Sequence, residues 1–186
     1  MHAACVALDG RAVLLAGASG AGKSTLSLAC ARMGWAFLGD DVVMVSANAS
    51  SDPVARAFPD EIDLTDDSLR FFPDLGSPGL ASATWEKRHI RPNDIAWLRI
   101  VRQARPAALV FPERGPGAQL SPMSVDEALI ELVPNVVRTD TRVAQRHLDT
   151  LGALARVVPA FRLEIADPFA APALLAPLLQ GRRGAR

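Results

Sequence analysis

The chain has 186 residues, of which 49% are hydrophobic, so it can bury a core of its own. We expect one domain over residues 1–180, followed by a flexible tail at 181–186. The formal net charge is zero, which argues against a surface built for nucleic acid or for an anionic membrane. No run approaches the about 18 apolar residues of a membrane span, and the N-terminus lacks a secretory signal, so a cytoplasmic protein is expected.

The first predicted element is a β-hairpin. Residues 3–8 and 11–16 are short apolar runs, and Asp9-Gly10 between them is the strongest two-residue turn signal in a sequence. In the register that this turn imposes, His2 falls opposite Gly17. The hairpin therefore predicts a histidine beside the segment that follows the second strand.

A helix is predicted next, at residues 23–33, with Gly34 in the position of a C-terminal cap. Strand-like apolar runs at 35–38 and 42–45 flank Gly39-Asp40-Asp41. Two carboxylates therefore lie at a strand end or turn, where functional residues collect.

The rest of the chain is less regular. Residues 47–94 are rich in Ser, Asp, Pro and Gly, which predicts a long irregular segment that is functional or mobile. Strands are expected to resume at 95–101 and 107–111. The remaining predictions are a capping box at Ser124-Val-Asp-Glu127 that opens a helix, a helix at 142–157, a strand at 161–165 and a helix at 171–180.

Between the hairpin and the first helix, residues 17–24 match the phosphate-binding pattern G-x-x-x-x-G-K-[ST] in full. The glycines let successive N–H groups point at phosphate oxygens, and the helix N-terminus adds partial positive charge. Lys23 is expected to reach the β and γ phosphates and Ser24 to ligate Mg²⁺, so ATP and Mg²⁺ are the expected cofactors. The predicted nucleotide contacts are Gly17, Ala18, Ser19, Gly20, Ala21, Gly22, Lys23, Ser24 and Thr25.

The acidic pair supplies groups for phosphoryl transfer. Of the two, one carboxylate can hold the metal and the other can accept the proton of an attacking hydroxyl. His2 could hydrogen-bond a phosphate or carry positive charge toward it. A solvated acidic turn and an unanchored N-terminal histidine are the simpler alternatives.

Taken together, His2-Ala-Ala, the hairpin, the phosphate-binding pattern and Gly39-Asp-Asp-Val42 resemble the catalytic domain of the HPr kinase/phosphorylase family, over roughly residues 2–45. The resemblance implies an α/β P-loop fold with a mixed, partly antiparallel sheet, related to the nucleotide-binding part of phosphoenolpyruvate carboxykinases. It also implies homo-oligomerisation. By resemblance Asp41 is the general base, and Asp40 binds the metal together with Ser24. His2 and Lys23 are the other catalytic residues that the resemblance implies.

A second segment resembles a looser group of HPr-kinase-like proteins, and its sequence is Lys87-Arg88-His89-Ile90-Arg91-Pro92. Lys87 and Arg91 are the candidates in it for cations that meet the γ phosphate in the transition state. A solvated basic turn is the alternative.

The function predicted from these residues is an ATP- and Mg²⁺-dependent kinase whose acceptor is a hydroxyl, on a serine of a protein or peptide or on a small molecule. Thr25 stands where the family carries an acidic residue, and the family's downstream signature for the reverse reaction is not found, so neither HPr nor phosphorolysis is predicted. Because the phosphate-binding pattern also serves switches and motors, a nucleotide-hydrolysing switch is the alternative. A nucleotide-binding protein without turnover is a third.

Overall fold

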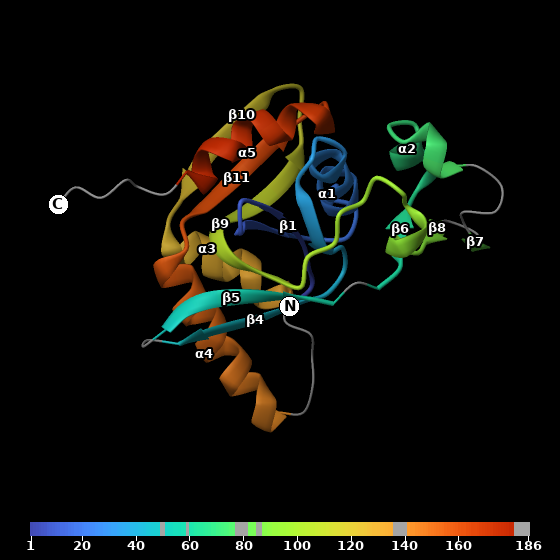
Figure 1. The fold of residues 1–186 in the computed structure, drawn as a ribbon. Coiled ribbons are helices and arrows are strands. Elements are labelled where there is room, and N and C mark those ends of the chain that lie inside the picture. The colour runs from blue at the N-terminus through green and yellow to red at the C-terminus, as the bar shows by residue number, and fades with distance from the viewer. Residues whose placement is uncertain (49–50, 59, 77–81, 85–86, 136–140, 181–186) are drawn as a thin grey trace.

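The computed structural model describes residues 1–48, 51–58, 60–76, 82–84, 87–135 and 141–180 (Figure 1). A central sheet has the strand order β10-β11-β9-β2-β1-β3, and a β4-β5 pair joins it through β5 and β9. The predicted tail at 181–186 lies outside the described residues. The strands are β1 (Ala3–Leu8), β2 (Arg11–Ala16), β3 (Ala36–Gly39), β4 (Val43–Asn48), β5 (Ser51–Ala57), β9 (Gln103–Arg114), β10 (Ala118–Met123) and β11 (Ala160–Ile165).

The sheet is mixed, as predicted. Strand β9 runs parallel to β2 on one side and to β11 on the other. The pairs β1-β2, β1-β3, β10-β11, β4-β5 and β5-β9 are antiparallel. The fold is therefore α/β with a partly antiparallel sheet.

The predicted hairpin is confirmed with its register. Asp9 and Gly10 have φ angles of 50° and 78°, the left-handed conformations that a two-residue hairpin turn requires. Ala3 lies opposite Ala16, so the strands deliver His2 and the start of the next loop to the same end of the sheet.

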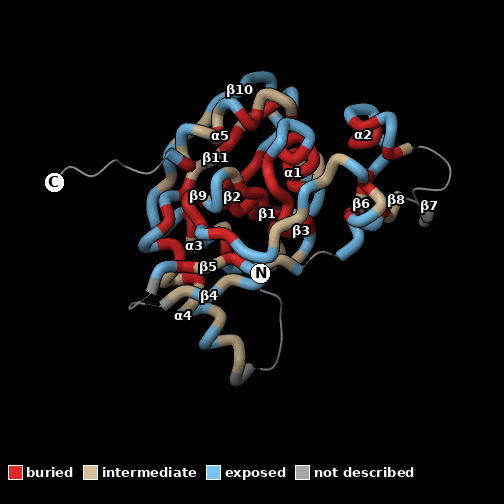
Figure 2. The backbone as a smooth tube through the Cα atoms, in the orientation of Figure 1, coloured by how far each residue is buried: buried red, intermediate tan, exposed pale blue. Residues whose placement is uncertain are grey.

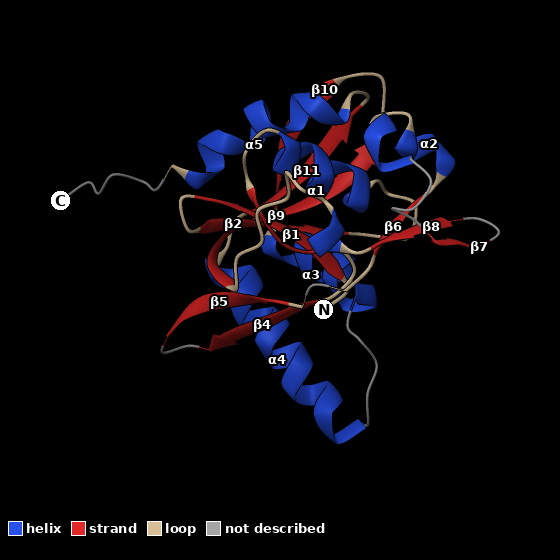
Figure 3. Cartoon of the chain, turned by 45° about the vertical axis from the view of Figure 1, so that its right-hand side comes forward, coloured by secondary structure: helices blue, strands red, loops and turns tan. Residues whose placement is uncertain are grey.

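Helices cover both faces of the sheet (Figure 3). One core cluster combines α1 (Lys23–Arg32) and α5 (Ala171–Leu179) with alternate residues of β1 and β2, and a second combines α3 (Val125–Leu132) and α4 (Thr141–Val157) with the intervening residues. The central strands are therefore buried on both faces (Figure 2). Within the described part of the chain, no helix is long and apolar enough to cross a membrane.

The helix predictions and the last strand are confirmed within one or two residues. Ser124 opens α3 with the predicted capping box, in which its hydroxyl accepts from the Glu127 N–H and the Glu127 carboxylate accepts from the Ser124 N–H. Short 3-10 turns complete the helical elements: η1 (Pro73–Gly76), η2 (Pro92–Asp94), η3 (Val133–Asn135) and η4 (Pro168–Ala170).

The prediction for residues 47–94 is wrong in its main point. The described residues of this segment contain β5, a second sheet of order β6-β8-β7, and a short helix. Ile62, Leu64 and Ile90 are fully buried in the same core as α1, which fixes this sheet beside the helix. Its elements are β6 (Ile62–Leu64), α2 (Asp66–Leu69), β7 (Ser82–Thr84) and β8 (Lys87–Ile90).

The predicted strand at 95–101 is also absent from the structure. Among the described residues, this segment pairs only through an isolated bridge from Ile100 to Phe37, and its apolar residues pack on the core from a loop. The prediction at 107–111 was too short, because β9 runs from Gln103 to Arg114. Strand β10 was not predicted at all.

Candidate active site

A glycine-rich loop joins the end of β2 to the start of α1 and occupies residues 17–22. Gly20 and Gly22 have φ angles of 83° and 95°, which L side chains rarely adopt. Gly22 is also the residue before the helix, and the first N–H groups of a helix have no acceptor inside it. The loop and the positive end of the helix dipole thus meet at one place.

Lys23 is folded over this loop. Its Nζ donates to the carbonyl oxygens of Gly17 and Ala18 at 2.8 and 3.0 Å, and the residue is only 6% exposed. Burial lowers the pKa of Lys23, while Asp40 and Asp41 act in the opposite direction. A compact ammonium is therefore held at the loop by two carbonyls and two nearby carboxylates.

The acidic pair lies where β3 ends. A Cβ atom at Gly39 would lie 2.9 Å from the Val42 carbonyl oxygen, so only glycine lets the chain bend this tightly. The bend turns Asp40 inward, where it is 4% exposed, and leaves Asp41 outward, with a side chain that is 61% exposed. The two carboxylates consequently have different environments and can take different roles.

Asp40 is buried without a countercharge at bonding distance among the described residues. Burial raises its pKa to about 6, although hydrogen bonds from the Ser24 hydroxyl and the Asp63 N–H favour the charged form. Ser27 Oγ lies 3.5 Å from Asp40 Oδ1. The carboxylate is thus surrounded by neutral donors in a position that a cation would stabilise.

This burial predicts a stability difference for Asp40→Asn. The pKa of Asp40 is near 3.8 in the unfolded chain and about 6 in the folded protein. Ionised Asp40 therefore destabilises the fold, and this penalty reaches its full size above pH 6. The penalty falls as the pH drops through 6 and is gone below 3.8, where both states are protonated. The shift corresponds to at most about 3 kcal/mol. We expect Asp40→Asn to stabilise the metal-free protein at pH 8 and to lose most of that advantage by pH 4.

The check is urea denaturation of both proteins in EDTA between pH 4 and 8. The difference in the free energy of unfolding reports Asp40 together with the groups whose charges act on it, because the remaining titrating groups are the same in both proteins. A variant less stable than wild type at pH 8 would contradict the assignment of a strained, buried carboxylate.

His2 and Asp41 form a pair, with His2 Nδ1 2.9 Å from Asp41 Oδ1. Burial lowers the pKa of His2, against the opposing effect of the Asp41 carboxylate. The backbone around the pair is fixed, since the Ala3 N–H donates to the Asp41 carbonyl at 3.1 Å and His2 bridges to Val42. The histidine is therefore anchored rather than loose, and it sets the orientation of the carboxylate.

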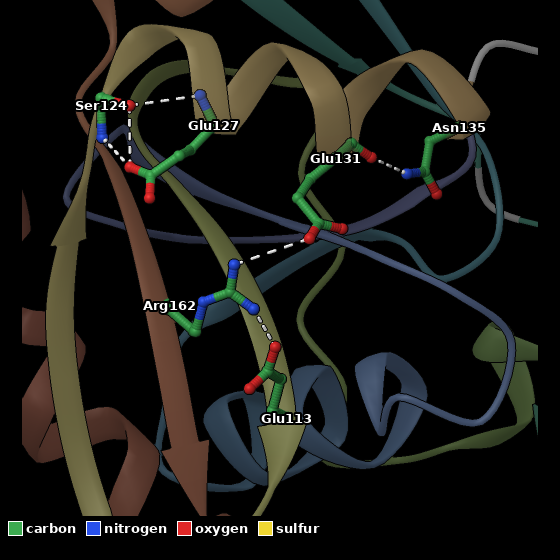
Figure 4. Close-up of polar contacts among 6 residues, drawn as sticks. All are labelled: Glu113, Ser124, Glu127, Glu131, Asn135 and Arg162. Carbon is green, nitrogen blue, oxygen red and sulfur yellow. Dashed lines mark hydrogen bonds and ion pairs between the residues drawn. The ribbon is translucent and has the colours of Figure 1, made fainter.

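A further support for His2 comes from α3 and the turn after it. The Asn135 carbonyl accepts from the His2 N–H at 2.7 Å, and the Asn135 side chain donates to the Glu131 carbonyl at 2.7 Å. Figure 4 shows this bond at the end of α3, with the capping box at the opposite end of the helix. The helix thus has defined ends, and η3, which follows it, holds the backbone of the histidine.

The small sheet contributes charged groups from β6 and β8. Lys87 Nζ lies 3.4 Å from Asp63 Oδ2, and His89 Nδ1 lies 2.6 Å from Asp63 Oδ1. The Asp63 backbone also bonds to Asp40. Strand β6 therefore connects the acidic bend at β3 with the basic residues of β8.

These elements enclose a cavity of about 190 Å³. Separate parts of the chain meet in it: the N-terminus, the glycine-rich loop with α1, the acidic bend, the small sheet with α2, and the end of β9. The residues that line it are His2, Ser19, Gly20, Gly22, Lys23, Ser24, Thr25, Asp40, Asp41, Asp63, Thr65, Ser68, Lys87 and Arg114.

Most of the residues predicted from the sequence thus lie together. Arg91 is not among the described residues that line the cavity; its Nε lies 2.8 Å from Asp94, and its side chain is 72% exposed. Gly17 and Ala18 meet the site through Lys23, and Ala21 lines a neighbouring cavity.

Four residues that line the cavity were not predicted from the sequence. Asp63, Thr65 and Ser68 reach it only because the small sheet packs beside α1, which no local pattern encodes. Arg114 ends β9, which runs parallel to β2, so it lies at the same edge of the sheet as the glycine-rich loop. This strand pairing is not encoded in a local pattern either. Charged residues at that edge are positioned for function.

The oxygen atoms of the cavity fit a Mg²⁺ ion that takes some of its ligands from the protein and the others from phosphate. Ser24 and Asp40 supply a hydroxyl and a carboxylate side by side. The described residues contain no group of three or more His, Cys, Asp or Glu that could hold a metal. Mg²⁺ bound through one or two protein oxygens, with the rest from phosphate and water, needs no such group.

Fold and site together define a mixed α/β domain with a polar cavity at the junction of a strand, a glycine-rich loop and a helix N-terminus. No family model matches the chain, and no curated protein matches it. Among solved structures, the Hpr(Ser) kinase/phosphatase from Coxiella burnetii aligns at a TM-score of 0.47 and 16% sequence identity. That alignment covers 98% of this chain and 95% of the other.

Proposed function

We propose that this protein is an ATP- and Mg²⁺-dependent phosphotransferase that moves the γ phosphoryl group to a hydroxyl acceptor, on a serine of a protein or peptide. The observation that carries the proposal is one cavity that combines Lys23 and the glycine-rich loop with two carboxylates in unlike environments. A phosphate-binding loop alone fits any nucleotide-binding protein. The exposed carboxylate beside it favours transfer, because a transferase must deprotonate an acceptor that arrives from solvent.

In this proposal Asp41 is the general base. Its side chain is exposed and is oriented by His2 at 2.9 Å, so it can reach a hydroxyl that enters the cavity. The acceptor oxygen forms a bond to the γ phosphorus as the bond from phosphorus to the β–γ bridging oxygen breaks. The acceptor proton goes to Asp41, and the nucleoside diphosphate leaves with the bridging oxygen.

The other groups bind phosphate and neutralise charge. Ser24 and Asp40 would hold Mg²⁺, which when bound offsets negative charge on the phosphates. Lys23 exchanges its bonds to the loop carbonyls for phosphate oxygens, and the N-terminus of α1 adds its dipole. Lys87, which lines the cavity from β8, adds a second cation for the transferred group.

The test is transfer of labelled γ phosphate from ATP, with Mg²⁺, into a desalted and heat-treated lysate of the source organism. Heat inactivates the endogenous kinases, and the peptides and proteins that stay soluble remain as acceptors. We expect a labelled protein or peptide that forms with wild type and not with Lys23→Ala or with EDTA. Phosphate release without any labelled product would instead identify a nucleotide-hydrolysing switch.

A further inference from the structure

A second cavity, of about 330 Å³, adjoins the first along the N-terminal turn of α1. Its walls come from the glycine-rich loop and α1, α2 and the residues after it, the end of β9, and the end of β11 with the segment that follows. Gly22, Thr25, Ser68 and Arg114 line both cavities. The two spaces therefore share a border formed by the same residues.

This border is a defined structure. Thr25 Oγ1 and Ser68 Oγ are 2.8 Å apart, and Ser68 Oγ lies 3.1 Å from Thr65 Oγ1. Thr65 is the N-cap of α2 and accepts from the Ser68 N–H. The hydroxyl chain ties α2 to the first turn of α1, so both cavities are fixed relative to the glycine-rich loop.

The second cavity differs from the first in its chemistry. Leu26, Ile165 and Pro168 are buried apolar residues in its wall. The first cavity, in contrast, is lined by charged side chains, hydroxyls and glycine. A ligand that spans both would have a highly charged end and an end of low polarity.

Phe71 is the wall residue that points most directly to the kind of ligand the cavity could hold. It is 39% exposed, although its ring is supported edge-on by Phe169 at a centroid distance of 6.5 Å and an angle of 63°. Phe169 is itself held by the buried Phe72 at 5.7 Å. A large aromatic ring is thus kept rigid with part of its surface toward an open cavity, as in sites that bind planar ligands.

The carboxylates of the wall are already paired. Glu113 forms an ion pair with Arg162, which also lies 3.6 Å from Glu131 (Figure 4). Asp67 lies 3.2 Å from Arg70. Because Arg70 and Arg114 lie in the same wall as Asp67 and Glu113, the wall has no net formal charge and does not repel a neighbouring chain of phosphates.

We infer that the second cavity holds the nucleoside of the nucleoside triphosphate, with its base against Phe71. This inference rests on the proposed function, which puts the triphosphate in the first cavity. The γ phosphate then lies toward Lys23 and Asp41, and the chain runs over Gly22 and Thr25 into the second cavity. Arg114, at the border, meets the phosphate nearest the nucleoside.

The experiment compares ATP with inorganic tripolyphosphate, which has the charged chain but no nucleoside. Isothermal titration calorimetry with Mg²⁺ measures both affinities for wild type, Phe71→Ala and Ala166→Trp. Ala166 is an exposed residue of the cavity wall, and a tryptophan there fills the space without touching the core. Phe58→Ala is the matched control, because Phe58 is 47% exposed and lines neither cavity.

We expect Phe71→Ala to weaken ATP binding by about tenfold, as loss of an aromatic stacking surface does. Ala166→Trp weakens it as well, and Phe58→Ala leaves it unchanged. Tripolyphosphate binds equally to all four proteins, because the first cavity is intact in each.

Two other results overturn the inference in distinguishable ways. If Phe71→Ala and Ala166→Trp both bind ATP like wild type, the nucleoside lies elsewhere and the proposed function stands. If wild type binds neither ATP nor tripolyphosphate, the proposed function fails together with the inference.

Discussion

Asp41→Asn is expected to bind ATP and Mg²⁺ like wild type and to transfer phosphate about 10²–10⁴-fold more slowly, the usual contribution of a general base. The amide has the same shape as the carboxylate but cannot accept the acceptor proton. Asp41 is exposed, so the substitution leaves the fold intact. Calorimetry measures binding, and initial rates of labelled phosphate transfer at saturating ATP measure turnover.

A matched control is Asp149→Asn, an exposed carboxylate on α4 that bonds only Gln145 within that helix among the contacts of the described residues. It should leave both binding and transfer at wild-type values. Unchanged transfer in Asp41→Asn would eliminate Asp41 as the base. Loss of ATP binding in that variant would instead assign Asp41 to the metal or the phosphates.

His2→Gln separates orientation of the base from proton acceptance. Glutamine can still donate to Asp41 from the same backbone position, which the Asn135 carbonyl and the bridge to Val42 hold. We therefore expect a smaller loss of transfer than in Asp41→Asn. The pH–rate profile reports the distinction, because a His2 that only positions Asp41 leaves the rising limb where it is.

The sequence predicted those parts of the fold that depend on near neighbours. The turn at Asp9-Gly10 fixes a register by itself, and the capping box at Ser124 specifies a helix start within four residues. The helices at 142–157 and 171–180 were found for the same reason, since a helix bonds within its own segment. Each prediction needed only local information.

The errors fall where strands depend on distant partners. Strand β5 contains Pro53 and two charged residues, and it is a strand because β4 and β9 flank it. Residues 95–101 have apolar side chains of the right kind, yet no strand in the described part of the chain pairs with them beyond one bridge. Pairing at long sequence separation, not composition, decides both cases.

The residues of the candidate site likewise divide into those that lie in one local motif and those that depend on distant packing. Residues 17–25 and the pair at Asp40 and Asp41 could be found because each stands in one continuous motif. The inward and outward orientation of the two carboxylates could not, since it follows from the bend at Gly39 and from packing against β6. Arg114 required knowledge that β9 lies next to β2.

Lys23→Ala is expected to lower the affinity for ATP by at least about 100-fold. The variant would lose the charge-assisted bonds of the Lys23 ammonium to the β and γ phosphates, and two such bonds at about 1.5–3 kcal/mol each exceed the about 2.7 kcal/mol of a 100-fold loss. In the ligand-free protein its Nζ bonds two loop carbonyls, and burial already lowers its pKa. Its removal therefore affects the ligand more than the fold, and thermal melting should shift by only a few degrees.

Lys23→Arg tests whether charge alone is sufficient. A planar guanidinium is larger than an ammonium and bonds in a fixed fork, and the space at Lys23 is closed by the carbonyls of Gly17 and Ala18 at 2.8 and 3.0 Å. We expect arginine to restore little of the affinity for ATP or for tripolyphosphate. Full restoration would mean that Lys23 acts as a distant positive charge, and the phosphates would then lie farther from the loop than this site implies.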